Sequence, residues 1–322
     1  MAAGRYDPDE HELNGYTSVA VTDGRSAAEL AVEAAYGALA RAGHDPEDIR
    51  LVLHASFFHQ GRDHWTPASY VQQQTVGGRA PAIELKQGSN GGLAGLELAL
   101  SYLTTHQYGE RDAALITTAD NFCLPVYQRY RTDKWIVLGD GASAAVVSRK
   151  PGFARVVSTA MDADPVLEEM YRGTGAFTPA PHGGPEPLDL RDRKRDFVGR
   201  LGFEEIALRE STGLNNVVKR ALKDADTDID NIARFVLPNV GRTLMQWQFL
   251  DVLGVGEERT TWEWGSEMGH MGAGDQFGGL HHLVTRGLLG PGDRVALVGS
   301  GIGFNWACAI LEIEETVSGE DR

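Results

Sequence analysis

The feature of this sequence that most constrains its fold is an internal repeat. Residues 38–49 lead into an apolar run at 51–53, and residues 221–232 lead into a second apolar run at 235–237. Both stretches are typical of an amphipathic helix, an Asp-bearing turn and a short buried strand. In this alignment Ala38 of the first stretch matches Ala221 of the second.

A second pair of segments repeats at nearly the same offset. A Leu/Ala-rich helix is predicted at 91–106, before the strand at 113–116, and another at 274–289, before the strand at 295–298. Here Ala114 matches Ala296. The sequence offsets of these two independent pairs of segments agree within one residue. We therefore predict that the chain is a duplicated unit. The first half is expected at 1–150 and the second half at 151–322.

The alternation of strands and helices within each half predicts an α/β fold with parallel strands covered by helices. The apolar segments at Leu51, Ile83, Leu115, Phe235 and Val295 are short, as buried parallel strands are. We therefore expect two βαβαβ halves, related by a pseudo-twofold axis, in five-layer α/β/α/β/α packing. The Gly- and Pro-rich stretch 173–190 is predicted to be a surface loop or linker between the halves.

Composition excludes several classes of protein. The formal net charge of −15 does not suit a nucleic-acid binder. No apolar run approaches the roughly 20 residues of a membrane span, and the polar N-terminus lacks the layout of a signal peptide. Two cysteines give no disulfide framework, so a cytoplasmic protein is expected. The basic run 191–195 allows two interpretations, a solvated helix start or a landing patch for coenzyme A phosphates or an acidic carrier protein.

The repeat also pairs two polar residues. Ser89 lies in Gln-Gly-Ser-Asn-Gly-Gly just before the first repeated helix, and its counterpart by offset is Met271, next to His270. A pseudo-twofold axis brings the two helix starts toward one cleft. Ser89 would have the free N–H groups and positive end of a helix beside it. The alternative interpretation is an ordinary N-cap serine.

His270 and a glycine cluster add further candidate groups. Asp275 follows His270 across a glycine-rich turn, and its carboxylate is suited to orient the imidazole. Alternatively, Asp275 caps a helix and His270 is a polar loop residue. The cluster 299–303 follows a strand, and the Gly301 N–H is a candidate oxyanion donor. The cluster is equally compatible with a tight turn between strands, and it is no nucleotide-binding fingerprint because no helix follows it.

Together these segments resemble the β-ketoacyl-acyl carrier protein synthase III family of the thiolase superfamily, from about Arg25 to Glu312. The resemblance is carried by residues 38–53, 88–100, Gly139-Asp140-Gly141-Ala142, Pro238-Asn239, Gly269-His270 and 299–306. It implies a thiolase fold, a homodimer, and coenzyme A or a carrier-protein phosphopantetheine as the acyl carrier, with no other cofactor.

The departures from that family concern its catalytic positions. The family's nucleophilic cysteine is Ser89 here, its histidine falls on Asn239, and its asparagine falls on His270. A cysteine near pKa 8.5 is activated by a helix end alone, whereas a serine hydroxyl needs a positioned base and an orienting group. His270 and Asp275 would supply both. This arrangement is similar to that of serine-using relatives in aromatic polyketide and related antibiotic pathways.

The expected function is acyl transfer from a carrier-protein or coenzyme A thioester, through acyl-Ser89, to a hydroxyl, amine or carrier thiol. In that scheme the Ser89 and Gly301 N–H groups hold the oxyanion. Asn239 donates to the acyl carbonyl or to the acceptor. One alternative is a starter-unit ketosynthase that condenses with malonyl thioesters, and another is an inactive partner subunit of a heterodimeric synthase.

Three expectations concern the surroundings of these groups. Trp65 is a candidate for reaching the partner's pocket in a homodimer, or else a core residue. Trp247, with Trp262 and Trp264, is expected to form an aromatic wall near Asn239 and His270. No metal site is expected, since His281-His282 has no further ligands at metal spacing, and Cys123 is interpreted as a buried or pocket-wall thiol.

Overall fold

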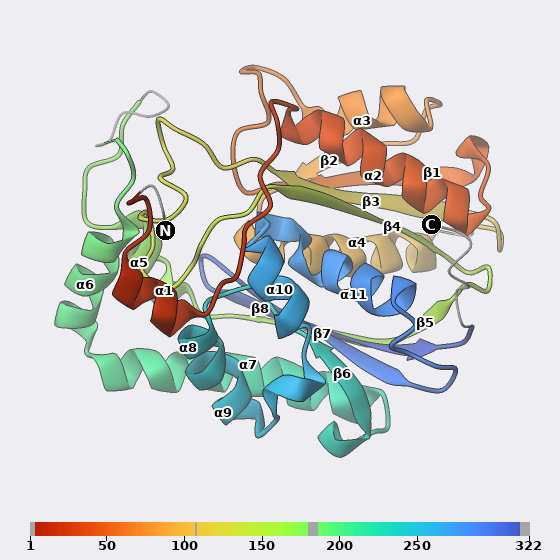
Figure 1. Cartoon of the computed structure of the whole chain (residues 1–322). Helices are drawn as coiled ribbons and strands as arrows, with labels where there is room; N and C mark the ends of the chain where they lie inside the picture. Colours follow the sequence, from red (N-terminus) through yellow and green to blue (C-terminus); the bar gives the residue numbers. More distant parts are fainter. Residues whose placement is uncertain (1–3, 107, 180–185, 316–322) are drawn as a thin grey trace.

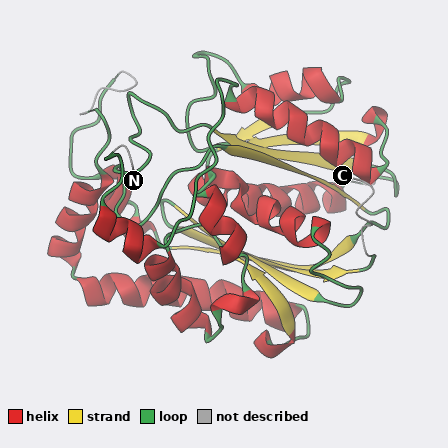
Figure 2. Cartoon of the chain, viewed as in Figure 1, coloured by secondary structure: helices red, strands yellow, loops and turns green. Residues whose placement is uncertain are grey.

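The computed structural model describes residues 4–106, 108–179 and 186–315. Within them, two four-stranded sheets enclose a central layer of helices, and further helices cover the outer faces (Figures 1 and 2). These are the five α/β/α/β/α layers of the predicted fold. None of the helices in these ranges is long and apolar enough to cross a membrane.

The first sheet has the order β2-β1-β3-β4, built from β1 (Ile49–Ala55), β2 (Ala82–Leu85), β3 (Ala113–Asp120) and β4 (Gly141–Ser148). β1 is parallel to β2 and β3, and β4 is antiparallel to β3. The second sheet has the order β5-β8-β7-β6, built from β5 (Ala154–Ala163), β6 (Ile232–Val236), β7 (Arg294–Gly301) and β8 (Asn305–Ile313). The five strands expected from short apolar segments are therefore all present.

The helices of the central layer are the repeated ones. α4 (Gly91–Thr105) packs on β1, β3 and β8, and α11 (Asp275–Thr285) packs on β4, β6 and β7. α2 (Ala27–Ala42) and α3 (Pro67–Thr75) cover the first sheet from outside, and α7 (Phe203–Asp224) covers the second. The remaining α-helices of the described residues are α1 (Pro8–Asn14), α5 (Glu169–Arg172), α6 (Leu190–Leu201), α8 (Arg242–Met245), α9 (Asp251–Leu253) and α10 (Trp262–Met268).

The repeat extends to the turns that precede the central helices. A 3₁₀ turn at Gly88–Asn90 begins α4, and one at Gly272–Gly274 begins α11. The first glycine of each turn has a positive φ, 54° and 62°. Ser89 and Ala273 are the second residues of these turns, so the counterpart of Ser89 is Ala273 rather than the Met271 predicted from the strand offset.

Close packing joins the two turns. A Cβ on Gly92 would lie 2.7 Å from the carbonyl oxygen of Ala273, and one on Gly91 would lie 3.2 Å from the Ala273 Cβ. Only glycine permits such an approach between the two helix starts. The pseudo-twofold contact therefore brings Ser89 and the segment after His270 together.

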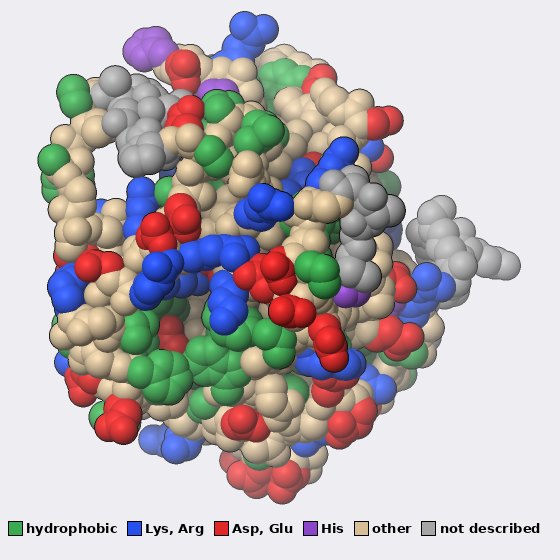
Figure 3. Space-filling view, turned by 60° about the vertical axis from the view of Figure 1, so that its left-hand side comes forward, with side chains coloured by type: hydrophobic (Ala, Val, Ile, Leu, Met, Phe, Trp, Pro, Cys, Tyr) green, Lys and Arg blue, Asp and Glu red, His purple; other side chains and the backbone are tan. Residues whose placement is uncertain are grey.

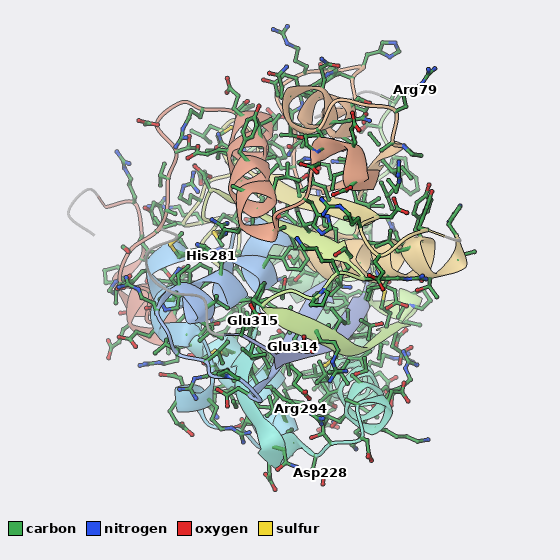
Figure 4. All side chains as sticks on the ribbon, turned by 90° about the vertical axis from the view of Figure 1, so that its right-hand side faces the viewer. Arg79, Asp228, His281, Arg294, Glu314 and Glu315 are labelled. Carbon is green, nitrogen blue, oxygen red and sulfur yellow. The ribbon has the colours of Figure 1, made fainter. Side chains whose placement is uncertain are left out.

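At the other end of the second sheet, away from these turns, charged side chains form ion pairs. Arg294 begins β7, and Glu314 and Glu315 follow β8 on this side (Figure 4). The Arg294 guanidinium lies 3.0 Å from Glu312, which also pairs with Arg155 at 3.1 Å.

One expectation about the linker was wrong. The described parts of the stretch 173–190 form a loop that leads into α6, but β5 precedes it and pairs with β8 in the second sheet. The loop is thus an excursion within the second half, not a connection between halves; residues 180–185 lie outside the described part of the chain. The pairing of β5 with β8 joins segments from the two ends of the second half, which no local pattern signals.

Candidate active site

Ser89, His270 and Asp275 form a continuous hydrogen-bonded chain. The Ser89 Oγ lies 2.6 Å from the His270 Nε2, and the His270 Nδ1 lies 2.6 Å from the Asp275 Oδ2. All three side chains are buried. Because the Asp275 carboxylate accepts a hydrogen bond from Nδ1–H, Nε2 is left to accept one from the Ser89 hydroxyl.

Backbone contacts fix the position of the imidazole. His270 N donates to the Val137 carbonyl at 2.8 Å, and the Gly139 N donates to the His270 carbonyl at 2.9 Å. His270 is thus held by the segment that leads into β4, while Ser89 is held by the turn before α4. The catalytic candidates therefore sit on elements whose positions are set by both halves.

Asp275 is fully buried and has several donors. Besides the imidazole, it accepts from the N–H groups of Asn239 and Met271, each at 2.8 Å. A buried carboxylate is tolerated only where such donors replace water. Asp275 starts α11, where the helix N-terminus also favours a negative charge.

Burial alone would lower the pKa of His270, because it disfavours the imidazolium. The charge of Asp275 and its hydrogen bond act in the opposite direction and outweigh burial, so the pKa of His270 is raised above its ordinary value. The Asp275 carboxylate thus stabilises the imidazolium that forms when His270 takes a proton from a hydroxyl.

A cavity of about 290 Å³ opens onto Ser89 and His270. Its floor on one side is the glycine loop after β7, through Ser300, Gly301 and Ile302. The rest of its wall is mainly apolar and aromatic, and includes Trp135, Tyr171, Phe203, Trp247, Phe249 and Phe304. The chain therefore carries a mainly apolar pocket that Ser89 and His270 help to line.

Comparison with known proteins shows which family this chain resembles. The C-terminal family model of 3-oxoacyl-[acyl-carrier-protein] synthase III matches residues 222–313. The β-ketoacyl-[acyl-carrier-protein] synthase III of Clostridium beijerinckii is 25% identical, over 91% of this chain and 86% of its own length. A Streptomyces coelicolor synthase III is 27% identical, over 90% and 83%.

Solved structures extend the likeness. ChlB3, an acyltransferase, is 35% identical with a TM-score of 0.91, and the match covers 98% of this chain and 92% of that one. The chain belongs to the synthase III-like group of the thiolase superfamily. The synthase III from Aquifex aeolicus, at 20% identity and a TM-score of 0.75 over 95% and 91% of the chains, shares the fold. This synthase III-like protein is accordingly an enzyme of the transferase class that handles acyl groups.

Asn239 of this synthase III-like protein is not placed as expected. Its side-chain amide donates to the Gly269 carbonyl at 3.0 Å and to the Asp275 Oδ1 at 3.3 Å, away from Ser89. Both amide hydrogens are therefore engaged, and neither is available to an acyl carbonyl or an acceptor. Asn239 instead holds Asp275, and its own carbonyl accepts from the Tyr16 hydroxyl at 2.8 Å.

The predicted oxyanion group needs a refinement. Gly301 is the last residue of β7 and pairs in register with Asn305. A Cβ on Gly301 would lie 2.4 Å from the Gln87 carbonyl, so this glycine allows the loop to pack against the Ser89 turn. The next residue, Ile302, lies against Gly88, because a Cβ there would be 3.0 Å from the Ile302 N. The Gly301–Ile302 backbone is thus the part of the loop beside the serine.

Of the tryptophans predicted to lie near the site, only Trp247 lines the cavity. Trp247 lines the cavity and makes a T-shaped contact with Trp135, with ring centroids 6.3 Å apart. Trp262 packs in the core against Tyr16 and Trp264 stacks on His282, so neither belongs to the wall, contrary to expectation. Trp65 is 38% exposed beside Tyr70, away from this chain's cavity. Its reach into a partner stays a prediction.

Sequence reasoning missed Asp120. Its buried carboxylate, at the end of β3, accepts from the N–H groups of Phe57 and Phe58 and, at 3.3 Å, of Ala273. Burial raises the pKa of Asp120 to about 7, although those N–H groups lower it. Asp120 thus connects the first half to the turn before α11. An acidic residue at a strand end was the available signal, but nothing in the sequence shows its partners.

The basic run 191–195 is only partly exposed to solvent. Arg191 pairs with Glu10 at 2.6 Å, Lys194 forms an ion pair with the buried Asp133, and Arg195 pairs with Asp192. On the face shown in Figure 3, Lys and Arg side chains gather in a band with Asp and Glu beside them. The run is thus largely neutralised, and Lys194 points inward, which neither interpretation of the sequence included.

Neither cysteine lines the cavity. Cys123 is exposed and lies outside the lining of the cavity, contrary to the expectation of a buried or pocket-wall thiol. Cys308 is buried, which raises the pKa of its thiol to about 12. Among the described residues, no group of His, Cys, Asp and Glu side chains is arranged to hold a metal ion.

Proposed function

We propose that this synthase III-like protein transfers an acyl group from a coenzyme A or carrier-protein thioester to Ser89, and then to a hydroxyl, amine or carrier thiol. The observation that carries the proposal is the hydrogen-bonded chain from Ser89 through His270 to Asp275, with both contacts at 2.6 Å. The same proposal includes a homodimer that works in the cytoplasm, in an antibiotic or polyketide pathway.

In the first step the Ser89 hydroxyl attacks the thioester carbonyl. His270 Nε2 takes the hydroxyl proton, and Asp275 stabilises the imidazolium that results. The tetrahedral intermediate collapses, the carbon–sulfur bond breaks, and the leaving thiolate takes the proton from His270. Acyl-Ser89 and a free thiol remain.

In the second step the acceptor repeats this path in reverse. Its hydroxyl, amine or thiol gives a proton to His270 Nε2 and attacks the ester carbonyl of acyl-Ser89. The Ser89 oxygen leaves and takes the proton back, which restores the enzyme. In both steps the oxyanion would be held by the Ser89 N–H and by the Gly301–Ile302 backbone beside it.

The arrangement supports transfer over decarboxylative condensation. Condensation in the resembled family uses a histidine and an asparagine to stabilise the enolate of a malonyl thioester. Here the amide of Asn239 is engaged by Asp275 and Gly269, which leaves one imidazole nitrogen at the cavity. Within the described residues, Asn239 therefore does not offer the side-chain donor that the starter-unit ketosynthase alternative would need beside His270.

The proposal is tested by intact-mass spectrometry of the purified protein offered a panel of acyl thioesters, followed by candidate acceptors. We expect an acyl adduct that is absent in Ser89→Ala and is discharged by one class of acceptor. A normal adduct on Ser89→Ala would overturn the proposal. Carbon dioxide release from malonyl carrier protein would favour the ketosynthase alternative. No adduct and no turnover would favour an inactive partner subunit.

A further inference from the structure

The cavity that reaches Ser89 has a polar part that the proposed transfer does not use. Lys194 of α6 and Glu210 of α7 both line it, among side chains that are mostly apolar or aromatic. Charged side chains are rarely enclosed in such surroundings unless they are paired or meet a ligand. The partners of each of the two side chains therefore decide whether it can contact a ligand.

Two neighbouring side chains fix the position of the Lys194 ammonium. Its ammonium forms an ion pair with Asp133, whose side chain is 2% exposed, and lies 4.7 Å from the centroid of the Tyr171 ring. The Lys194 side chain itself keeps 19% of its surface exposed. Since it lines the cavity, part of that surface faces the space where a ligand would lie.

Glu210 is less completely paired. In the described part of the chain its carboxyl has no ion-pair partner within 4.0 Å, and it hydrogen-bonds the side chain of Gln248, which also lines the cavity. Burial raises the pKa of Glu210 to about 7, while the charge of Lys194 and the Gln248 bond lower it. Hydrogen-bonding capacity of the carboxyl thus remains open to the cavity.

The charges of this cluster restrict what it can bind. A charged ligand group would meet charges of both signs here: a carboxylate is attracted by Lys194 but repelled by Glu210 and Asp133, and an ammonium is attracted by the two carboxylates but repelled by Lys194. A plain alkyl group would leave both polar side chains against hydrocarbon, which is costly. A neutral hydroxyl can accept from the Lys194 ammonium and donate to the Glu210 carboxyl.

The rest of the wall favours a ring. Trp247 contacts both Trp135 and Phe203, at centroid distances of 6.3 and 5.8 Å, and all three line the cavity. Flat ligands gain offset-stacked or edge contacts with such side chains. We propose that Lys194 and Glu210 form a hydroxyl subsite that selects a hydroxylated aromatic group. Its role in the reaction, as part of the acyl group or of the acceptor, rests on the proposed acyl transfer.

Binding tests the subsite without requiring acyl transfer. Calorimetry with the Ser89→Ala protein would compare benzoyl-N-acetylcysteamine with its three hydroxybenzoyl isomers. We expect at least one isomer to bind about tenfold more tightly than the benzoyl compound, because that compound leaves the polar pair unmatched. Equal affinity for all four compounds, and for benzyl alcohol and its hydroxylated forms, would overturn the subsite, whatever the outcome for acyl-Ser89.

Variants locate the preference. In the Ser89→Ala background, Glu210→Leu is expected to bring the affinity ratio close to one, whereas Glu210→Gln retains most of it because an amide still hydrogen-bonds a hydroxyl. Lys194→Met combined with Asp133→Asn removes the ammonium without leaving a buried carboxylate unpaired. Glu204→Leu, at an exposed position of the same helix as Glu210, is the matched control. An unchanged ratio in both Glu210→Leu and the double variant would overturn the assignment.

The wild-type protein distinguishes the two sources of the hydroxylated ring. A preference for hydroxybenzoyl over benzoyl thioesters in the rate of adduct formation assigns the subsite to the acyl group. A preference for hydroxylated benzyl alcohols in the discharge of a preformed adduct assigns it to the acceptor. A preference in neither step would refute a role of the subsite in catalysis.

Discussion

The hydroxyl oxygen of Ser89 lies 2.6 Å from the Nε2 of His270, although 181 residues separate the two in sequence. The contact exists because the two halves of a duplicated fold meet at the starts of α4 and α11. Removing the base should therefore leave the fold intact and the serine unactivated. His270→Ala is expected to lower the rate of acyl loading about 10³-fold, measured by time-resolved intact mass.

The effects of removing Ser89 and His270 on the rate should not be additive, because the two residues act as one unit. Because Ser89→Ala carries no acyl adduct, the comparison uses the residual transfer of the acyl group to the acceptor, in which the double variant Ser89→Ala, His270→Ala is expected to be no slower than Ser89→Ala alone. A further large loss in the double variant would mean that His270 acts independently of Ser89.

Asp275→Asn tests the orienting role of the carboxylate. The amide can donate to Nδ1 and so stabilise the tautomer with the proton on Nε2, which cannot accept from Ser89. Acyl loading should fall about 10⁴-fold, as expected when a triad carboxylate is replaced by its amide. Circular dichroism and thermal unfolding of the variant provide the control, since Asp275 also binds the N–H groups of Asn239 and Met271. Loading close to that of the wild type would contradict the role.

The raised pKa of His270 predicts a pH dependence. The base must be unprotonated to accept from Ser89, so loading should increase with pH and reach half its maximum above 6.5, the ordinary value. The effect on stability has the opposite direction. A pKa raised in the folded state gives a stabilisation that is present below the ordinary value and is lost as pH rises through the folded value. The difference in free energy of unfolding between the wild type and His270→Gln should thus shrink as pH rises. A half-maximum below 6.5 would contradict the dominance of Asp275 over burial.

Much of this architecture was predictable because its signals are local. Apolar segments and Asp-bearing turns marked β1, β3, β6 and β7, and the common offset placed Ser89 near His270. The inward direction of Lys194 was not predictable. Every residue in the run 191–195 is charged, so the sequence does not single out Lys194. Its side chain is directed into the cavity because α6 packs against Asp133 and Tyr171.

The direction of the Asn239 side chain also explains why its predicted role was wrong. The sequence places Asn239 at a catalytic position of the resembled family, but its side-chain amide donates to Asp275, 36 residues further along the chain. A hydrogen-bond partner that distant leaves no trace in a single sequence. The pairing of β5 with β8 escaped prediction for the same reason.

Thiol chemistry provides a test of the nucleophile that needs no mutation. Cys123 is exposed, whereas burial raises the pKa of Cys308 to about 12, so iodoacetamide should modify Cys123 alone in the folded protein. Acyl loading should continue after modification, because neither thiol lies at the cavity. Peptide mass mapping identifies the alkylated residue. If loading stopped in the wild type but continued in Cys123→Ser, the serine mechanism would have to be reconsidered.

The contact between the helix starts can be tested through Gly92. In Gly92→Ala the new Cβ would lie 2.7 Å from the carbonyl oxygen of Ala273. The turns before α4 and α11 would have to separate, at a cost of about 1–3 kcal/mol in the free energy of unfolding. Acyl loading should fall as well, because Ser89 and His270 are carried by those two segments.

Gly199→Ala is the matched control, since Gly199 lies in α6 and a Cβ there meets nothing within 4 Å. That substitution should stabilise the protein by about 0.4–1 kcal/mol, because alanine reduces the freedom of the unfolded chain. Urea unfolding of both variants, with acyl loading measured in parallel, separates the effects. If Gly92→Ala and Gly199→Ala behaved alike, the close approach of the two halves would not be what holds Ser89 against His270.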